Sequence, residues 1–309
     1  MQQSDKLNTA ANPLLCDVET GLCELPSDHI NNPTTAAKAD LKPVKVIYYT
    51  DPICSSCWGI EPQLRKLKLE YGHILEIEYR MGGLLPDWSY NSGGISSPED
   101  VAQHWNEASL HYDMPIDGDL WLEDPLNSSY PPSIAFKAAQ MQDNEKAVLF
   151  LRIMRELLFL EKKNISKWTH LETAAIRSGL DPLQLKKDFE DRAKIRFNED
   201  LSLAKELGVR GFPSMYFINA SGQSEFVYGS KPYAFYEVAL LTLVPQVKKH
   251  DYNKTVEALF EQYYSLTAKE FSELSGTPRS DSEHLLNQLT SQGKLHKLTS
   301  KNGSLWKLK

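Results

Sequence analysis

Two cysteines separated by two residues, Cys54 and Cys57, carry the most specific chemistry in this sequence. A cysteine thiolate attacks disulfides, and a second thiol three residues on can close a disulfide or resolve a mixed one. The pair therefore predicts thiol–disulfide exchange, with Cys54 as the attacking thiolate and Cys57 as the resolving thiol. A zinc half-site and two structural cysteines are the alternatives.

The flanking sequence places the pair at a junction between a strand and a helix. Residues 44–49 form an apolar, β-branched and aromatic run that is typical of a buried strand, and Asp51-Pro52 is a turn signal. A helical pattern follows, in which Pro62 is expected to cause a kink. Cys54 would then lie at a helix N-terminus, where unpaired N–H groups and the positive end of the helix dipole favour the thiolate.

Two neighbours of the dithiol have two interpretations each. Glu61 lies one turn after Cys57; it either assists proton transfer from that thiol or, as is more common, is a solvated helix residue. Trp58 either forms a wall of the substrate site or packs as a core aromatic.

A second motif lies far downstream, where residues 208–214 precede the strand-like run 215–218. A Cys-x-x-Cys after the first strand and a Gly-x-Pro before a late strand resemble the arrangement of the thioredoxin fold. The resemblance implies that Pro213 is a cis proline packed against the dithiol, and cis peptide bonds are almost confined to proline. It also implies that the backbone around Phe212 pairs with a substrate strand.

The overall composition indicates a globular protein, with 309 residues, 41% hydrophobic residues, 24% charged residues and a net charge of −7. The acidic balance argues against a dedicated polyanion binder. No secretory signal opens the chain, and no apolar run approaches the roughly 18 residues that a membrane-spanning helix needs. We expect a cytoplasmic protein that needs no membrane, metal or cofactor.

The pattern along the chain predicts an α/β protein in four parts. Residues 1–43 are a flexible segment, 44–85 and 208–247 form the thioredoxin-fold core, and 86–207 are a helical insertion. Helices are expected within the insertion at Pro98–Tyr112, Pro131–Gln142, Asn144–Glu161, Lys167–Ser178 and Asp181–Leu207, with Asp143 as an N-cap and Gly179 as a C-cap.

The fourth part, residues 252–309, reads as a small winged-helix-like domain. Its signals are a capping box formed by Thr267 and Glu270, and a hairpin turn at Asn302-Gly303. Because Asp281 and Glu283 lie on the candidate recognition helix, the sequence argues against nucleic-acid binding and favours protein docking or packing.

Cys16 and Cys23 form a second pair within the N-terminal segment. Three interpretations are open: the thiols are idle or merely redox-sensitive, they exchange disulfides with Cys54 and Cys57, or all four cysteines bind zinc. The first is favoured, because a spacing of six residues is loose for a zinc knuckle.

Blocks throughout the chain resemble the SpxH (YjbH) branch of the DsbA-like thioredoxin superfamily. They are Thr50–Gly72, Asp119–Glu123, Ala135–Ala139, Phe150–Arg152, Glu161–Ile165 and Asn302–Lys307, and the similarity extends over residues 44–309. The resemblance implies a thioredoxin fold with a large inserted helical lobe, as in DsbA-like proteins. Adapter members often carry a Cys/His-rich, zinc-binding N-terminal stretch, whereas Cys16 and Cys23 have a different spacing and no nearby histidine cluster.

Two functions follow from this resemblance. DsbA-like relatives exchange disulfides, and SpxH-type proteins deliver a redox-stress transcription factor to the ClpXP protease. The sequence favours a cytoplasmic DsbA-like oxidoreductase that acts on protein disulfides. The alternative is an adapter that binds a client for ClpXP, with the dithiol as a redox switch on docking.

Overall fold

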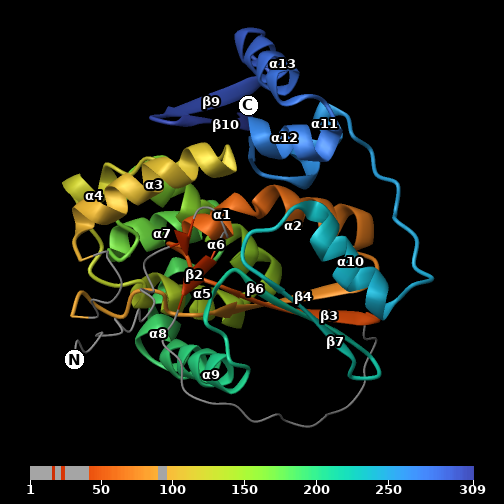
Figure 1. Cartoon of the computed structure of the whole chain (residues 1–309). Helices are drawn as coiled ribbons and strands as arrows, with labels where there is room; N and C mark the ends of the chain where they lie inside the picture. The colour runs from red at the N-terminus through yellow and green to blue at the C-terminus, as the bar shows by residue number, and fades with distance from the viewer. Residues whose placement is uncertain (1–15, 18–21, 25–41, 90–95) are drawn as a thin grey trace, which may run out of the picture.

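A four-stranded mixed sheet forms the centre of the molecule (Figure 1). The computed structural model describes residues 16–17, 22–24, 42–89 and 96–309. The strand order is β4 (Leu75–Met81), β3 (Val44–Thr50), β6 (Ser214–Asn219) and β7 (Ser224–Tyr228). β3 is parallel to β4 and antiparallel to β6, and β6 is antiparallel to β7. This is the sheet expected of the thioredoxin fold.

Helices cover both faces of this sheet (Figure 1). α2 (Glu61–Tyr71) and α10 (Tyr233–Leu243) lie on one face, and α5 (Tyr130–Gln142) and α9 (Arg192–Glu206) lie on the other. Because both faces are covered, the central strand β3 is almost continuously apolar rather than alternating.

The helical insertion forms as the sequence predicts, with two differences: an additional short helix at Leu120–Glu123, and a break in the last predicted helix. Its remaining helices are α3 (Pro98–Tyr112), α4 (Leu120–Glu123), α6 (Asn144–Phe159), α7 (Trp168–Arg177) and α8 (Pro182–Glu190). Asp143 caps α6 as predicted. Gly179 is predicted as a C-cap; the C-cap of α7 is Ser178, and Gly179 follows it with a φ of +72°. The helix predicted over 181–207 is instead two helices, α8 and α9, because Asp191 leaves helical geometry at φ −116° and ψ −99°.

The C-terminal part packs on the outer side of α2 and has a small core of its own (Figure 1). Its elements are α11 (Val256–Gln262), β8 (Leu266–Thr267), α12 (Ala268–Ser275), α13 (Arg279–Ser291), β9 (Leu295–Ser300) and β10 (Gly303–Leu308). The predicted capping box between Thr267 and Glu270 is present at the start of α12.

The N-terminal segment contains two short strands where the sequence predicts no regular structure. β1 (Cys16–Asp17) pairs with β2 (Leu22–Glu24), and β2 pairs with β5 (Gly211–Phe212) to form a second, three-stranded sheet. The prediction of a flexible segment is wrong for these five residues, because the partner strand β5 lies some 190 residues away and leaves no local signal. The rest of 1–41 lies outside the described residues.

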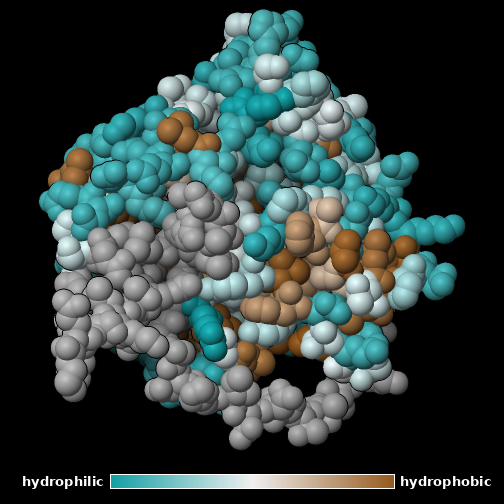
Figure 2. All heavy atoms as spheres, in the orientation of Figure 1, coloured by the Kyte–Doolittle hydropathy of each residue, from teal (hydrophilic) through white to brown (hydrophobic). Residues whose placement is uncertain are grey.

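The face shown in Figure 2 is mostly hydrophilic, with hydrophobic side chains gathered over α10 and the edge of the sheet beside it. Phe235 and Val238 on α10 and Phe226 on the edge strand β7 are more than 45% exposed.

Candidate functional site

Cys54 is the N-cap of the short helix α1 (Ser55–Gly59), as the sequence predicts. The backbone N–H of Cys57 donates to Cys54 Sγ at 3.3 Å, which gives the sulfur one of the otherwise unsatisfied N–H groups of the helix start. α1 ends at Ile60, where α2 begins, with Pro62 in the first turn of α2, so the predicted kink is present. Both sulfurs are fully buried.

Asp51 fixes the loop that delivers Cys54 to the helix. Its Oδ1 accepts from the N–H of Ile53 at 3.0 Å, and its Oδ2 accepts from the N–H of Leu84 at 2.8 Å and the hydroxyl of Ser129 at 2.9 Å. Burial nevertheless dominates and raises the pKa of Asp51 from 3.8 to about 6. One side chain thus connects the dithiol loop to the segments after β4 and before α5.

The downstream motif lies against the dithiol as predicted. The Phe212–Pro213 peptide bond is cis, and the Cys54 thiol donates a long hydrogen bond of 4.0 Å to the carbonyl oxygen of Phe212. The ring of Phe212 packs over Gly82, where a Cβ atom would come within 1.7 Å of the ring. A glycine is therefore required at position 82 for β5 to approach the end of β4.

The sequence predicts that the backbone around Phe212 pairs with a substrate strand. In the structure the chain's own β2 pairs with β5 at this position. Cys23 is the antiparallel partner of Phe212, and Glu24 is the partner of Gly211. The expected role of Phe212 in pairing with a substrate stays a prediction.

A buried arginine of α6 lies beneath the dithiol. The Arg155 guanidinium donates to Thr50 Oγ1 at 2.6 Å and to the carbonyl oxygen of Asp51 at 3.2 Å, and it pairs with Glu61 at 2.8 Å. Its side chain is fully excluded from solvent. A buried cation at this position favours negative charge on the neighbouring sulfurs.

The two thiols consequently differ in acidity. Burial raises the pKa of Cys54 well above its usual value, and the neighbouring Cys57 sulfur adds to the rise. Burial opposes ionisation of Cys57 as well, but a hydrogen bond from Cys54 and the charge of Arg155 lower the pKa of Cys57. The sequence predicts the thiolate on Cys54; the buried arginine instead favours it on Cys57.

Glu61 and Trp58 are both parts of the packed interior. Glu61 binds Arg155 and lies 3.6 Å from Arg65, so it is not a solvated helix residue; its role in proton transfer stays a prediction. Trp58 is fully buried, stacks on Phe159 and donates from Nε1 to the carbonyl oxygen of Pro115 at 3.1 Å. These contacts correspond to the core interpretation of Trp58.

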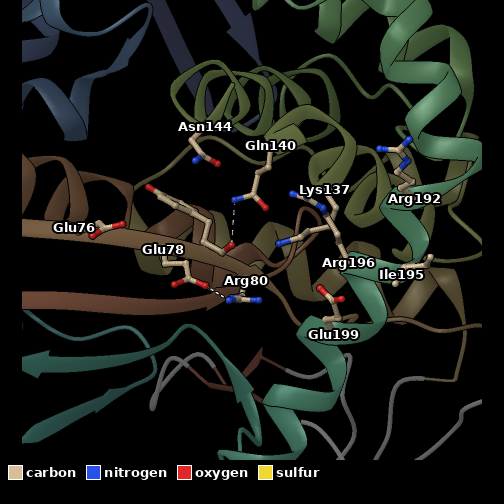
Figure 3. A pocket seen from close by; sticks show the side chains of 11 residues that line it. Glu76, Glu78, Arg80, Lys137, Gln140, Asn144, Arg192, Ile195, Arg196 and Glu199 are labelled. Carbon is tan, nitrogen blue, oxygen red and sulfur yellow. Dashed lines mark hydrogen bonds and ion pairs between the residues drawn. The ribbon is translucent and has the colours of Figure 1, made fainter. Parts of the chain in front are cut away.

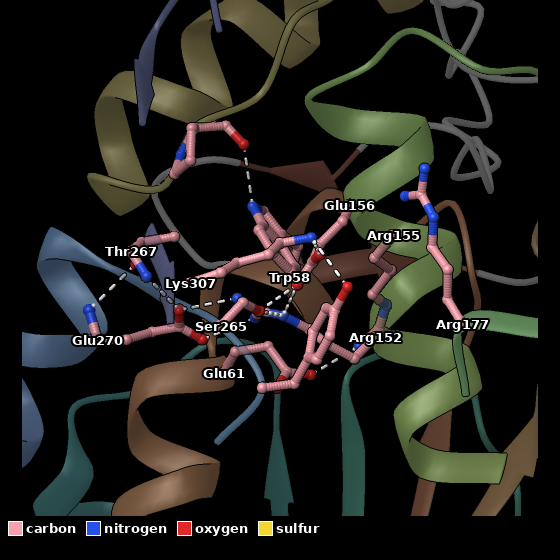
Figure 4. A network of polar contacts seen from close by, with 12 residues as sticks. Trp58, Glu61, Arg152, Arg155, Glu156, Arg177, Ser265, Thr267, Glu270 and Lys307 are labelled. Carbon is pink, nitrogen blue, oxygen red and sulfur yellow. Dashed lines mark hydrogen bonds and ion pairs between the residues drawn. The ribbon is translucent and has the colours of Figure 1, made fainter. Parts of the chain in front are cut away.

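A network of buried charges joins the dithiol helices to the C-terminal part (Figure 4). Arg152, one turn before Arg155, makes two hydrogen bonds to Glu270, at 2.7 and 3.0 Å. Arg152 also pairs with Glu156 at 2.8 Å, and its guanidinium lies 4.3 Å from the centre of the Trp58 ring. Because Glu270 also caps α12, the network fixes the C-terminal part on α6.

Further contacts complete this junction. Arg65 on α2 donates to the backbone oxygen of Ser265 at 2.7 Å, and Lys307 on β10 pairs with Glu156 at 2.9 Å. Although burial favours the neutral acid, Arg152 and Lys307 hold the pKa of Glu156 below its usual value. Arg152 and Arg65 do the same for Glu270.

A polar pocket of about 610 Å³ lies between β4, α5 and α9 (Figure 3). Acidic and basic side chains alternate on its wall, and Lys137 and Arg80 both pair with the buried carboxylate of Asp200, at 2.8 and 2.7 Å. The pocket contains none of the predicted site residues.

The described side chains do not assemble a metal centre. Within residues 42–89 and 96–309, no three histidine, cysteine, aspartate or glutamate side chains come together as metal ligands. The four-cysteine zinc interpretation stays a prediction, because the side chains of Cys16 and Cys23 lie outside the described part. In the part of the chain that is described, no helix is long and apolar enough to span a membrane.

Comparisons with known proteins place this site in a family. A thioredoxin family model matches residues 48–238. The ClpXP adapter protein SpxH of Halalkalibacterium halodurans is 33% identical over 298 residues, which cover 94% of this chain and 96% of that protein. The chain belongs to the SpxH family. The SpxH protein of Bacillus subtilis is 29% identical over 271 residues, covering 86% of this chain and 89% of that protein.

Solved structures resemble a smaller part of this SpxH-family chain. A putative protein disulfide isomerase from Nitrosomonas europaea has a TM-score of 0.58 and 19% identity, covering 66% of this chain and 98% of that one. The cytosolic disulfide reductase DsbM from Pseudomonas aeruginosa has a TM-score of 0.52 and 21% identity, covering 64% and 99%. At these identities the likeness confirms the thioredoxin fold with its helical insertion.

The comparisons also separate the two predicted functions. The names of the full-length relatives favour the adapter alternative over the oxidoreductase function that the sequence analysis put first. The winged-helix assignment of residues 252–309 stays a prediction, because the family model ends at residue 238.

Sequence reasoning missed three residues of the site. Asp51 is read as a turn residue, although its carboxylate holds three groups around the dithiol. Arg152 and Arg155 lie in the apolar stripe of α6, between Leu151, Met154 and Leu158. The sequence signal that could have identified the two arginines is their charge at positions where the helical period predicts apolar residues.

Proposed function

We propose that this chain is an SpxH-type adapter that binds a client protein and presents it to the ClpXP protease. One observation carries the proposal: relatives named ClpXP adapters match 94% and 86% of the chain, including the C-terminal part. The disulfide enzymes of known structure match about two thirds of it. The region beyond the thioredoxin fold is thus shared with adapters.

The rigid junction suits this role. An adapter has to hold the client-binding surface in a fixed position, and the Arg152–Glu270 contact ties the C-terminal part to the helical lobe with two charged hydrogen bonds. The client expected from the family resemblance is a transcription factor of the redox-stress response. We place the chain in the cytoplasm as part of this proposal.

The proposal is tested by degradation of that transcription factor by purified ClpXP. Addition of the chain is expected to accelerate degradation by roughly tenfold at limiting client, a gain equivalent to about 1.4 kcal/mol of binding. An equal degradation rate with and without the chain would contradict the adapter function. Bovine serum albumin at the same concentration serves as the control for crowding.

A second candidate is thiol–disulfide exchange on proteins, which the position of Cys54 as a helix N-cap beside Phe212 favours. Reduction of insulin disulfides in a glutathione buffer, compared with that of the Cys54→Ser variant, tests it. Turnover that disappears in the variant would establish the activity. Equal rates in the two proteins would restrict the dithiol to a regulatory role.

A further inference from the structure

The second cysteine pair is placed beside the dithiol by the backbone of the N-terminal strands. β2 adds to the edge of β5 with Cys23 directly opposite Phe212. Phe212 is also the residue whose carbonyl oxygen accepts from the Cys54 thiol, at 4.0 Å. Cys23 and Cys54 are therefore both neighbours of one residue, from two segments 31 positions apart in the sequence.

The register within the N-terminal strands places Cys16 directly opposite Cys23. Cys16 is the antiparallel partner of Cys23, and Asp17 is the partner of Leu22. Residues directly opposite in an antiparallel ladder have Cα atoms about 4.5–5.5 Å apart, which lies within the range of about 4.4–6.8 Å that disulfides span. The strand register is thus compatible with the Cα separation of a Cys16–Cys23 disulfide.

The position of β2 is the one in which an extended peptide adds to a sheet edge. An external peptide held there would present its own disulfide to Cys54. In this chain the residues opposite β5 include a cysteine, and a second cysteine lies one strand further out. The N-terminal strands therefore have the backbone placement of a substrate that is covalently part of the molecule.

We infer that Cys16 and Cys23 are an internal substrate of the Cys54/Cys57 dithiol, so that oxidation of one pair is passed to the other within the chain. A small-molecule disulfide first oxidises Cys54 and Cys57 to a disulfide. The Cys23 thiolate attacks Sγ of Cys54, the Cys54–Cys57 bond breaks, and Cys57 leaves as a thiolate.

The second step completes the transfer. The Cys16 thiolate attacks Sγ of Cys23, the Cys23–Cys54 bond breaks, and Cys54 leaves as a thiolate. Two electrons and two protons pass from Cys16 and Cys23 to Cys54 and Cys57, so the balance needs no other reactant. The acidity of Cys57, which Arg155 supports, suits it as the leaving group of the first step.

This inference goes beyond the adapter function and does not depend on it. If a client binds near the dithiol, it would meet two thiols at Cys16 and Cys23 in one oxidation state and a Cys16–Cys23 disulfide in the other. The direct test nevertheless involves neither ClpXP nor a client, so it can fail or succeed separately.

The first experiment traps the mixed disulfide in the full chain. In the double variant Cys16→Ser, Cys57→Ser, both resolving thiols are absent, and oxidised glutathione is expected to yield a Cys23–Cys54 cross-link that peptide mass spectrometry identifies. The matched variant Cys23→Ser, Cys57→Ser keeps Cys16 on the same tether. It is expected to give at least tenfold less cross-link and to accumulate glutathione on Cys54.

Equal cross-linking in the two variants would overturn the inference, because the tether alone would then explain it. Glutathione on Cys54 in both variants, without a cross-link, would overturn it as well.

The second experiment uses the wild-type sequence and does not depend on those variants folding. The Cys16–Cys23 disulfide is expected to form at least tenfold faster with oxidised glutathione in wild type than in Cys54→Ser, at a rate independent of protein concentration. Serine is a good N-cap residue, so this variant should keep the start of α1. The same rate in both proteins would contradict the internal transfer.

Discussion

The dithiol loop and the buried charge junction are both organised by α6, yet they differ in how the sequence encodes them. The dithiol is a local motif, with two cysteines three residues apart at a helix N-terminus. The junction joins Arg152 to Glu270, which is 118 residues away, and Arg65 to Ser265, which is 200 residues away. The first indicates the chemistry of the site, whereas the second shows how the C-terminal part is attached to the thioredoxin fold.

The contrast also concerns what each region needs. The dithiol needs a nearby positive charge that lowers the pKa of Cys57, and Arg155 supplies this charge from the interior. The junction needs mutual neutralisation, because isolated buried charges are costly and these acids and bases compensate one another.

The largest effect is expected from removing Arg152 at the junction. Arg152→Ala leaves the carboxylates of Glu270 and Glu156 without their main partner in a buried site, and should reduce the free energy of unfolding by about 3–5 kcal/mol. Urea unfolding monitored by tryptophan fluorescence measures this change.

The matched control is Arg279→Ala. Arg279 forms ion pairs with Asp113 and Glu283, all of which are partly exposed, and its loss should cost about 0–1 kcal/mol. Equal decreases in the free energy of unfolding of Arg152→Ala and Arg279→Ala would show that the buried ion pairs stabilise the fold no more than the exposed ones do.

A smaller effect, with a distinct pH dependence, is expected at Asp51. Burial raises the pKa of this carboxyl from 3.8 to about 6 in the folded protein, so the folded state binds the proton more tightly than the unfolded state. The resulting stability is complete below about pH 4 and is lost as pH rises through about 6.

Asp51→Asn removes this titration. The amide keeps one acceptor but turns its NH₂ group towards groups that donate to Asp51, so we expect a general loss of about 1–3 kcal/mol. Urea unfolding from pH 4 to pH 7 should show a wild-type decline relative to the variant of up to about 3 kcal/mol. A constant difference between the two proteins across this range would contradict the assignment.

The effect most specific to the chemistry of the dithiol is expected at Arg155, whose loss also leaves Glu61 without its nearest ion-pair partner. Arg155→Met keeps much of the side-chain volume and removes the buried cation, which should raise the pKa of Cys57 and slow its alkylation by iodoacetamide several-fold at neutral pH. Peptide mass spectrometry would resolve Cys57 from Cys54. An unchanged rate at Cys57 would show that Arg155 only supports packing.

These regions also show which structural features can be predicted from the sequence alone. The run 44–49 and the turn at Asp51 each carry a local signal, and the strand and the helix start appear where those signals predict them. The cis peptide bond before Pro213 appears where the resemblance to the thioredoxin fold implies it. The break at Asp191 was missed because the apolar period continues on both sides of it.

What sequence reasoning cannot supply is pairing between distant segments. Nothing within residues 16–24 indicates that Cys23 will face Phe212, since the register depends on the edge that β5 leaves open. The same holds for Arg152, whose partner Glu270 is read in isolation as one half of a capping box. Both observations require the folded chain.

The most direct test of the adapter account compares ClpXP degradation of the client with wild type and with the double variant Cys54→Ser, Cys57→Ser. An adapter binds its client through surfaces, so the account predicts that the variant in reducing buffer accelerates degradation as much as wild type does. A variant that binds no client and gives no acceleration, while remaining folded, would contradict the account and make the dithiol itself the active element.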